Sequence, residues 1–191
     1  MNQKNLLEVD WSKIPAPPDD GAAVHLVGMT IPPLSLRATD DTAVTLSALS
    51  GRSVVFAYPR TGEPGKISLV DDWDMIPGAR GCTPQTCSFR DLFAELKAAG
   101  AKQVFGLSTQ SNAYQTEMAS RLHLPFPVLS DENLALTRAL DLPTMEVAGL
   151  TLIKRLALIV DNARITHVFY PVFPPDRNAG DVLAWLKQNR V

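Results

Sequence analysis

Two short apolar segments separated by an amphipathic helix constrain the fold of this chain most strongly. Residues 53–58 and 103–108 have the length of strands, and their apolar character indicates strands buried on both faces. Between them, residues 83–99 place apolar side chains at helical spacing, and Gly100 marks the end of the helix. This alternation of buried strands and helices is typical of an α/β fold.

The remaining segments continue the alternation. A hairpin is predicted around Asp40-Asp41, between strands at residues 34–36 and 44–46. Further predicted elements are helices over 111–122, 133–140 and 179–189, a strand over 126–130, and a hairpin of strands over 150–160 and 164–170. The pattern as a whole predicts a central mixed sheet flanked by helices.

Length and composition exclude several classes of protein. The chain has 191 residues, 46% hydrophobic and 20% charged, with a net charge of −2, which fits one globular domain. Scattered Lys and Arg residues argue against nucleic acid as a partner. The chain lacks both an apolar stretch of the roughly 18 residues that span a bilayer and the apolar run of a signal peptide. We therefore expect a cytoplasmic protein with no membrane partner.

Residues 1–24 are predicted to form an extended N-terminal arm, and residues 25–191 the folded domain. Prolines within residues 14–20 prevent a helix there, because proline lacks the N–H and restricts the residue before it. Trp11 is a candidate for pinning the arm to the body of the chain or to a second subunit. Both a monomer and a homodimer fit this pattern.

A long loop over residues 60–81 separates the first buried strand from the helix. Glycine and proline interrupt it repeatedly, and a loop this long inside a compact domain is usually functional or disordered. Trp73, Met75 and Ile76 are apolar side chains with which the loop can pack down. We therefore expect an ordered insertion, spanning residues 61–80, beside the functional site.

The only two cysteines of the chain, Cys82 and Cys87, lie at the start of this helix. Only the thiolate is nucleophilic, and an ordinary thiol, with a pKa of about 8.5, is mostly protonated at neutral pH. The free N–H groups and partial positive charge of a helix N-terminus favour the anion at Cys82. Arg80 and Arg155 are candidates for an additional positive charge. In a reducing compartment, such a pair is more typically catalytic or metal-binding than structural.

The five-residue spacing of the cysteines predicts a conformational cycle rather than a static disulfide. In an unbroken helix, Cys87 follows Cys82 after about 500° of rotation and roughly 7.5 Å of rise. That separation exceeds the roughly 7 Å between Cα atoms that a disulfide bridges. We expect Cys82 to be oxidised to a sulfenic acid, the first turn to unwind, and Cys87 to condense with it. The alternative is that either cysteine is a small buried apolar residue.

The sequence predicts neither a metal site nor a bound cofactor. A second cysteine pair is missing, and His25, His123 and His167 are scattered without the spacing of zinc ligands. A copper-binding chaperone stays open as an alternative, because His123 or His167 can approach the cysteines in space.

Residues 81–91, Gly-Cys-Thr-Pro-Gln-Thr-Cys-Ser-Phe-Arg-Asp, resemble the active-site segment of the peroxiredoxins. The resemblance is closest to the Q-type (bacterioferritin-comigratory) subfamily, which has two cysteines spaced C-x4-C. It continues in four further segments, at residues 56–59, 105–108, 126–131 and 154–161.

This resemblance implies a thioredoxin-like fold and an antioxidant enzyme that reduces hydrogen peroxide and organic hydroperoxides. Thioredoxin or a similar thiol protein is then the electron donor, and no cofactor is needed. The resemblance makes Cys82 the peroxidatic thiol and Cys87 the resolving thiol of an intramolecular disulfide. It makes Arg155 the guanidinium that stabilises thiolate and peroxide, and a fixed cation with several donors suits a developing oxyanion.

Two positions depart from the family pattern P-x-x-x-T-x-x-C, because no proline stands seven residues before Cys82 and the threonine is also missing. Ala79 stands three residues before Cys82, where the family carries a threonine whose hydroxyl bonds the peroxide. We expect either Thr61 to fold back and supply the hydroxyl or Thr83 to substitute for it. Pro59 is expected to end the strand and shield the site.

A thioredoxin-like thiol–disulfide oxidoreductase, or a redox sensor, is the alternative function. Oxidoreductases of that kind use C-x-x-C spacing, which this chain does not have. The spacing therefore favours the peroxidase.

Overall fold

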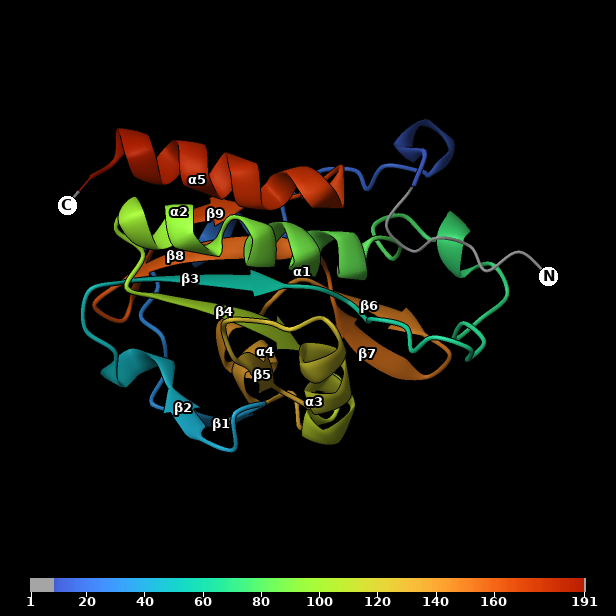
Figure 1. Cartoon of the computed structure of the whole chain (residues 1–191), viewed down its shortest axis with the longest axis horizontal. Coiled ribbons are helices and arrows are strands. Elements are labelled where there is room, and N and C mark those ends of the chain that lie inside the picture. The colour runs from blue at the N-terminus through green and yellow to red at the C-terminus, as the bar shows by residue number, and fades with distance from the viewer. Residues whose placement is uncertain (1–8, 191) are drawn as a thin grey trace.

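The computed structural model describes residues 9–190 (Figure 1), in which seven strands form one mixed sheet in the order β2-β1-β5-β4-β3-β8-β9. The strands of this sheet are β1 (Ser35–Ala38), β2 (Ala43–Thr45), β3 (Arg52–Ala57), β4 (Gln103–Ser108), β5 (Val128–Ser130), β8 (Leu156–Asp161) and β9 (Arg164–Phe169). Strands β3, β4 and β5 are parallel, whereas β1, β8 and β9 pair antiparallel with their neighbours. A separate hairpin consists of β6 (Thr144–Val147) and β7 (Leu150–Ile153).

Five α-helices lie within the described residues. They are α1 (Cys82–Asp91), α2 (Phe93–Ala98), α3 (Asn112–Arg121), α4 (Ala135–Leu140) and α5 (Asn178–Gln188). Short 3-10 turns occur at η1 (Trp11–Lys13), η2 (Val24–Leu26), η3 (Leu46–Ala48), η4 (Trp73–Met75) and η5 (Pro175–Arg177). Ser111 caps α3, because its hydroxyl accepts a hydrogen bond from the backbone N–H of Tyr114. Within residues 9–190, no helix has both the length and the apolar character to cross a membrane.

Strand β3 is the centre of the fold, because both of its faces are buried. Val54, Phe56 and Tyr58 pack into one apolar cluster with α1, α2 and α5, while Val55 and Ala57 pack into a second cluster with α4. Side chains of a strand alternate between its two faces, so a continuous apolar run is what two covered faces require. The predicted doubly buried strand is confirmed.

Helix α1 is held on the sheet by aromatic stacking. The ring of Phe89 lies parallel to that of Phe56, with 4.1 Å between the centroids. Figure 1 shows α1 beginning beyond the tip of the β3 arrow and running back over it, with α5 lying over α1 and α2. The start of α1 is therefore fixed beyond the carboxyl end of a central strand, where open α/β sheets place their ligands.

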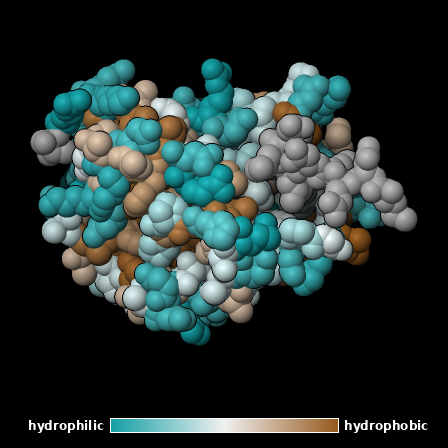
Figure 2. Space-filling model, viewed as in Figure 1, coloured by the Kyte–Doolittle hydropathy of each residue, from teal (hydrophilic) through white to brown (hydrophobic). Residues whose placement is uncertain are grey.

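On the face shown in Figure 2, hydrophilic residues are spread widely, with apolar residues in small groups between them.

Two expected elements are divided in the structure. The helix expected over 83–99 is interrupted at Leu92, where ψ is 11°, so α1 and α2 are separate. The spacing of apolar residues predicts which side chains lie on one face of a helix, but it does not predict a change of ψ at a single residue.

The strand expected over 150–160 is also wrong as a single element, because the structure divides it into β7 and β8. Strand β7 pairs with β6, which the sequence did not predict, whereas β8 joins the main sheet beside β3.

Candidate active site

Cys82 is the first residue of α1 and is 3% exposed. Gly81 caps the helix with φ 103° and ψ 17°, a left-handed conformation that glycine adopts without strain. The thiol donates a hydrogen bond to the carbonyl oxygen of Ala79 over 3.5 Å. The backbone turn at residues 78–81 therefore folds around the sulfur.

Arg155 is the polar partner of this sulfur. Its side chain is 2% exposed, and its Nη2 donates to Cys82 Sγ over 3.3 Å. The same nitrogen donates to the carbonyl oxygens of residues 78, 79 and 80 at 3.0–3.3 Å. Arg155 lies in the link between β7 and β8, so the change from one sheet to the other carries its guanidinium into the site.

A buried amide relay holds the other side of the guanidinium. Arg155 Nη1 donates to Gln85 Oε1 over 2.5 Å, and Gln85 Nε2 donates to Asn178 Oδ1 over 2.9 Å. Gln85 lies one turn after Cys82, and Asn178 begins α5. The sequence reasoning missed both residues. Gln85 stands inside the recognised cysteine segment, whereas Asn178 becomes a neighbour only through the packing of α5 on α1.

A cavity of about 70 Å³ reaches Cys82, and Thr61 and Thr83 both belong to its wall. It adjoins a wider opening of about 230 Å³, which shares the wall residues Thr61 and Trp73. Pro59 follows β3 and is buried, but among the described residues it is not part of the wall of the smaller cavity. The structure therefore brings two of the three expected substrate-contacting residues together with Cys82.

The segment before α1 packs on the β6–β7 hairpin. Trp73 and Ala79 form a small apolar cluster with Val147 and Leu152, and Ile76 packs at its edge. Met75 does not follow the expectation, because its side chain is 61% exposed. The 3-10 turn η4 directs Trp73 inward and its neighbour Met75 outward, which a count of apolar residues in an irregular segment does not reveal.

Arg80, the second candidate cation, does not face the thiol. Its Nη1 pairs with Asp74 Oδ1 over 2.9 Å, while its backbone carbonyl accepts from Arg155. Arg155 alone of the two supplies a guanidinium to Cys82.

Cys87 lies on the second turn of α1, 5% exposed, and both thiols are free. Burial raises the pKa of the Cys87 thiol above its ordinary value, and Arg90 and Arg121 oppose this shift only in part. Cys87 is therefore held as a protonated thiol in the intact helix.

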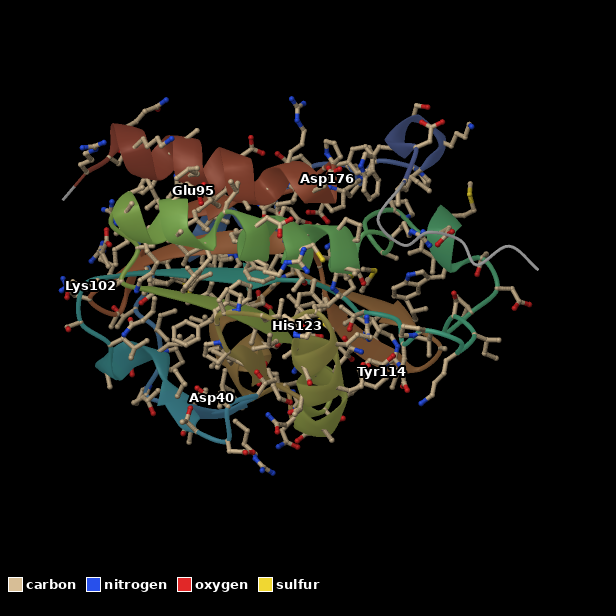
Figure 3. The ribbon with its side chains drawn as sticks, viewed as in Figure 1. Asp40, Glu95, Lys102, Tyr114, His123 and Asp176 are labelled. Atoms are coloured by element: carbon tan, nitrogen blue, oxygen red, sulfur yellow. The ribbon has the colours of Figure 1, made fainter. Side chains whose placement is uncertain are left out.

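The N-terminal arm reaches the start of α1. The indole Nε1 of Trp11 donates to Asp176 Oδ2 over 2.9 Å, and Figure 3 labels Asp176 at the beginning of the C-terminal helix. A Cβ at Gly81 would lie 2.7 Å from the Trp11 ring and 2.5 Å from Pro175. Trp11 thus pins the described part of the arm to the body, as expected. The part of the arm over residues 1–8 lies outside the described residues.

Two of the three histidines have partners other than the cysteines. His167 stacks on Trp185, with 5.0 Å between the ring centroids, and His25 bonds the carbonyl of Leu140. Within residues 9–190, no three His, Cys, Asp or Glu side chains are arranged to hold a metal ion.

Comparison with known sequences gives one consistent family. Residues 26–183 match the family described as Redoxin. A protein of Oryza sativa subsp. japonica named "Peroxiredoxin Q, chloroplastic" is 32% identical over 162 residues, 84% of this chain and 66% of the rice protein. The protein of the same name from Sedum lineare is 31% identical, over 84% of this chain and 77% of that protein. The chain thus spans about two thirds of the length of the rice relative.

Solved structures agree with these sequences. The crystal structure of peroxidoxin BcpB from Mycobacterium tuberculosis aligns with a TM-score of 0.69 and 25% identity, over 86% of this chain and 98% of that one. The bacterioferritin comigratory protein of Xanthomonas campestris, from a study of its alkyl peroxide reduction activity, aligns with a TM-score of 0.64 and 26% identity. That alignment covers 81% of this chain and 90% of the other.

The contact of Gly81 with the arm leads to a test. We expect Gly81→Ala to lower the free energy of unfolding by about 1–3 kcal/mol, because alanine is strained at this φ and its Cβ meets Trp11 and Pro175. The rate at which iodoacetamide alkylates Cys82 should also change, because the turn at residues 78–81 shifts. Gly100→Ala is the matched control, since Gly100 has φ +110° with open space around it. Equal losses of stability in the two variants would show that the contact with Trp11 and Pro175 contributes nothing.

Proposed function

Because this chain belongs to the redoxin family and is a peroxiredoxin of the Q type, we propose that it reduces hydrogen peroxide and organic hydroperoxides through Cys82. The observation that carries this proposal is the buried Arg155 guanidinium 3.3 Å from the sulfur of a cysteine that begins a helix. A cation and free helix N–H groups at one sulfur favour a nucleophilic thiolate and the oxyanion that leaves.

The proposed first step is an attack of the Cys82 thiolate on the terminal oxygen of the hydroperoxide. A sulfur–oxygen bond forms while the oxygen–oxygen bond breaks, so sulfur loses two electrons and the substrate gains them. The leaving oxygen takes up the proton released by the thiol and departs as an alcohol or as water. Arg155 donates hydrogen bonds to the sulfur and to this oxygen as charge moves between them.

We propose that Thr61 and Thr83 form the part of the cavity wall that contacts the substrate. Both line the cavity at Cys82, and both carry the hydroxyl that Ala79 lacks. Pro59 ends β3 and has no N–H, so the chain leaves the sheet there and reaches the cavity wall at Thr61. Residues 61–80 form the proposed active-site insertion of a catalytic domain over 25–191, and the packing of Trp73 and Ala79 supports this assignment.

We propose that Cys87 resolves the sulfenic acid. The Cys87 thiolate attacks the sulfur of Cys82, the disulfide forms, and the hydroxyl group leaves as water once it is protonated. Because the two residues are five apart in α1, the first turn must unwind before the sulfur atoms can meet. Thioredoxin or a similar dithiol protein then reduces the disulfide, in a reducing compartment such as the cytoplasm.

Cysteine variants test this cycle directly. One equivalent of hydrogen peroxide should lower the intact mass of the reduced protein by about two mass units through an intramolecular disulfide. Cys82→Ser should abolish consumption of peroxide with thioredoxin and thioredoxin reductase. Cys87→Ser should still be oxidised once at Cys82 but should not form that disulfide. Full turnover by the Cys82→Ser variant would refute the assignment.

The buried thiol predicts how the resolving step depends on pH. Burial raises the pKa of Cys87 in the intact helix. The protonated thiol therefore stabilises the intact helix over the unwound one, fully so below the ordinary pKa of a thiol. This stabilisation is lost as the pH rises through the raised pKa. Opening and deprotonation both favour disulfide formation, so its rate should rise with pH to beyond the ordinary thiol pKa of about 8.5. Stopped-flow fluorescence after a single peroxide pulse measures this rate. A rate that is constant between about pH 6 and 8 would contradict a protonated Cys87.

A further inference from the structure

The chain leaves β3 beside the chain that leaves β4, and side chains join the two beyond the end of the sheet. The parallel pairing reaches Ala57 and Leu107, and the N–H of Tyr58 still donates to the carbonyl of Leu107 over 3.1 Å. Pro59 has no N–H, so the backbone ladder stops there. The hydroxyl of Ser108 instead donates to the carbonyl of Pro59 over 3.2 Å.

Gln110 then takes the place of a partner strand for Thr61. Its Oε1 accepts from the backbone N–H of Thr61 over 2.9 Å, and its Nε2 donates to the Thr61 carbonyl over 3.2 Å. The Thr61 hydroxyl donates to the same Oε1 over 3.1 Å. Thr61 is 1% exposed and Gln110 is 4% exposed, so these bonds are shielded from water.

The two hydrogen bonds between Gln110 and the Thr61 backbone fix the direction of the hydrogen bond between Gln110 and the Thr61 hydroxyl. An amide has one accepting oxygen and one donating nitrogen, and only one orientation of Gln110 suits both the N–H and the carbonyl of Thr61. That orientation points Oε1 at the Thr61 hydroxyl, and an amide oxygen can only accept. The hydroxyl proton is therefore committed to Gln110, and the lone pairs of Thr61 Oγ1 stay free to accept.

Gln110 is itself held rigidly. Its backbone N–H donates to the Ser108 hydroxyl over 3.2 Å. Its carbonyl accepts from Ser130 Oγ over 2.8 Å and from Gln115 Nε2 over 3.0 Å. A buried network in which every member is satisfied gives its side chains one arrangement.

We propose that Gln110 is a positioning residue for the peroxidase reaction, which holds Thr61 at the wall of the Cys82 cavity with its hydroxyl oxygen set to accept a hydrogen bond from the substrate. This inference rests on the proposed function. The bond partner is the O–H of the hydroperoxide, on the oxygen that Cys82 attacks, while Arg155 donates from its own side. A substrate that lacks this O–H, such as a dialkyl peroxide or a disulfide, gains nothing from Thr61.

A double-mutant cycle tests the proposal. The measurement is the second-order rate constant for oxidation of Cys82 by hydrogen peroxide, from single-turnover fluorescence. Thr61→Val, which removes the hydroxyl, should lower it about 10- to 100-fold, and Thr61→Ser should retain most of it. Gln110→Met should lower it by about 10-fold in the native background, and should lower it no further in the Thr61→Val background.

Two further variants separate positioning from loss of structure. Gln110→Glu keeps the oxygen that accepts from Thr61, and its protonated form has an O–H that can donate to the Thr61 carbonyl, so at a pH where the acid is protonated it should stay closer to the native rate than Gln110→Met, even if both unfold at lower temperature. Gln103→Met removes a glutamine that bonds Ser53 at the opposite end of β4, and it should leave the rate constant unchanged.

The inference is overturned if Gln110→Met lowers the rate by the same factor with and without the Thr61 hydroxyl, or if Gln110→Glu is as slow as Gln110→Met. Failure of the proposed function is a different result, namely undiminished consumption of peroxide by Cys82→Ser.

Discussion

The site depends on one buried cation. The guanidinium of Arg155 is 2% exposed, and its partners among the described residues are three carbonyl oxygens, the amide oxygen of Gln85 and the sulfur of Cys82. Burying a charge is costly unless its hydrogen bonds are satisfied. Of these partners, only the sulfur can become an anion by losing a proton. Arg155 therefore joins the Cys82 sulfur to the turn at residues 78–80 and to Gln85.

This dependence joins distant parts of the chain. The carbonyl groups come from the turn that ends at Gly81, and Trp11 and Pro175 pack against that turn from the two ends of the sequence. Gln85 and Cys82 both lie in the first turn of α1, so unwinding that turn removes two partners of Arg155 at once. An intact first turn and a Cys82–Cys87 disulfide are therefore mutually exclusive arrangements of one molecule.

The sequence predicted the features of the fold and the site that depend on patterns within a short segment. Apolar runs, cysteine spacing and a family resemblance predicted the doubly buried strand β3, the helix that begins at Cys82 and the contact of Arg155 with Cys82. The missing threonine at position 79 drew attention to Thr61 and Thr83. Gln110 left no signal, because it meets Thr61 across 49 positions of sequence and only after the two strands pair. The break before Arg155 was equally hidden, since an apolar run does not say which sheet it joins.

Hydrogen–deuterium exchange of the α1 backbone, compared between the reduced protein and the protein carrying the Cys82–Cys87 disulfide, tests the central claim most directly. The claim predicts slow exchange for the amides of residues 85–88 in the reduced protein, because these N–H groups bond to the carbonyls of residues 81–84 when the first turn is intact. In the disulfide form, these amides should exchange much faster, while those of α5 stay protected. Equal protection of residues 85–88 in both forms would contradict the claim, because the disulfide would then have formed without unwinding.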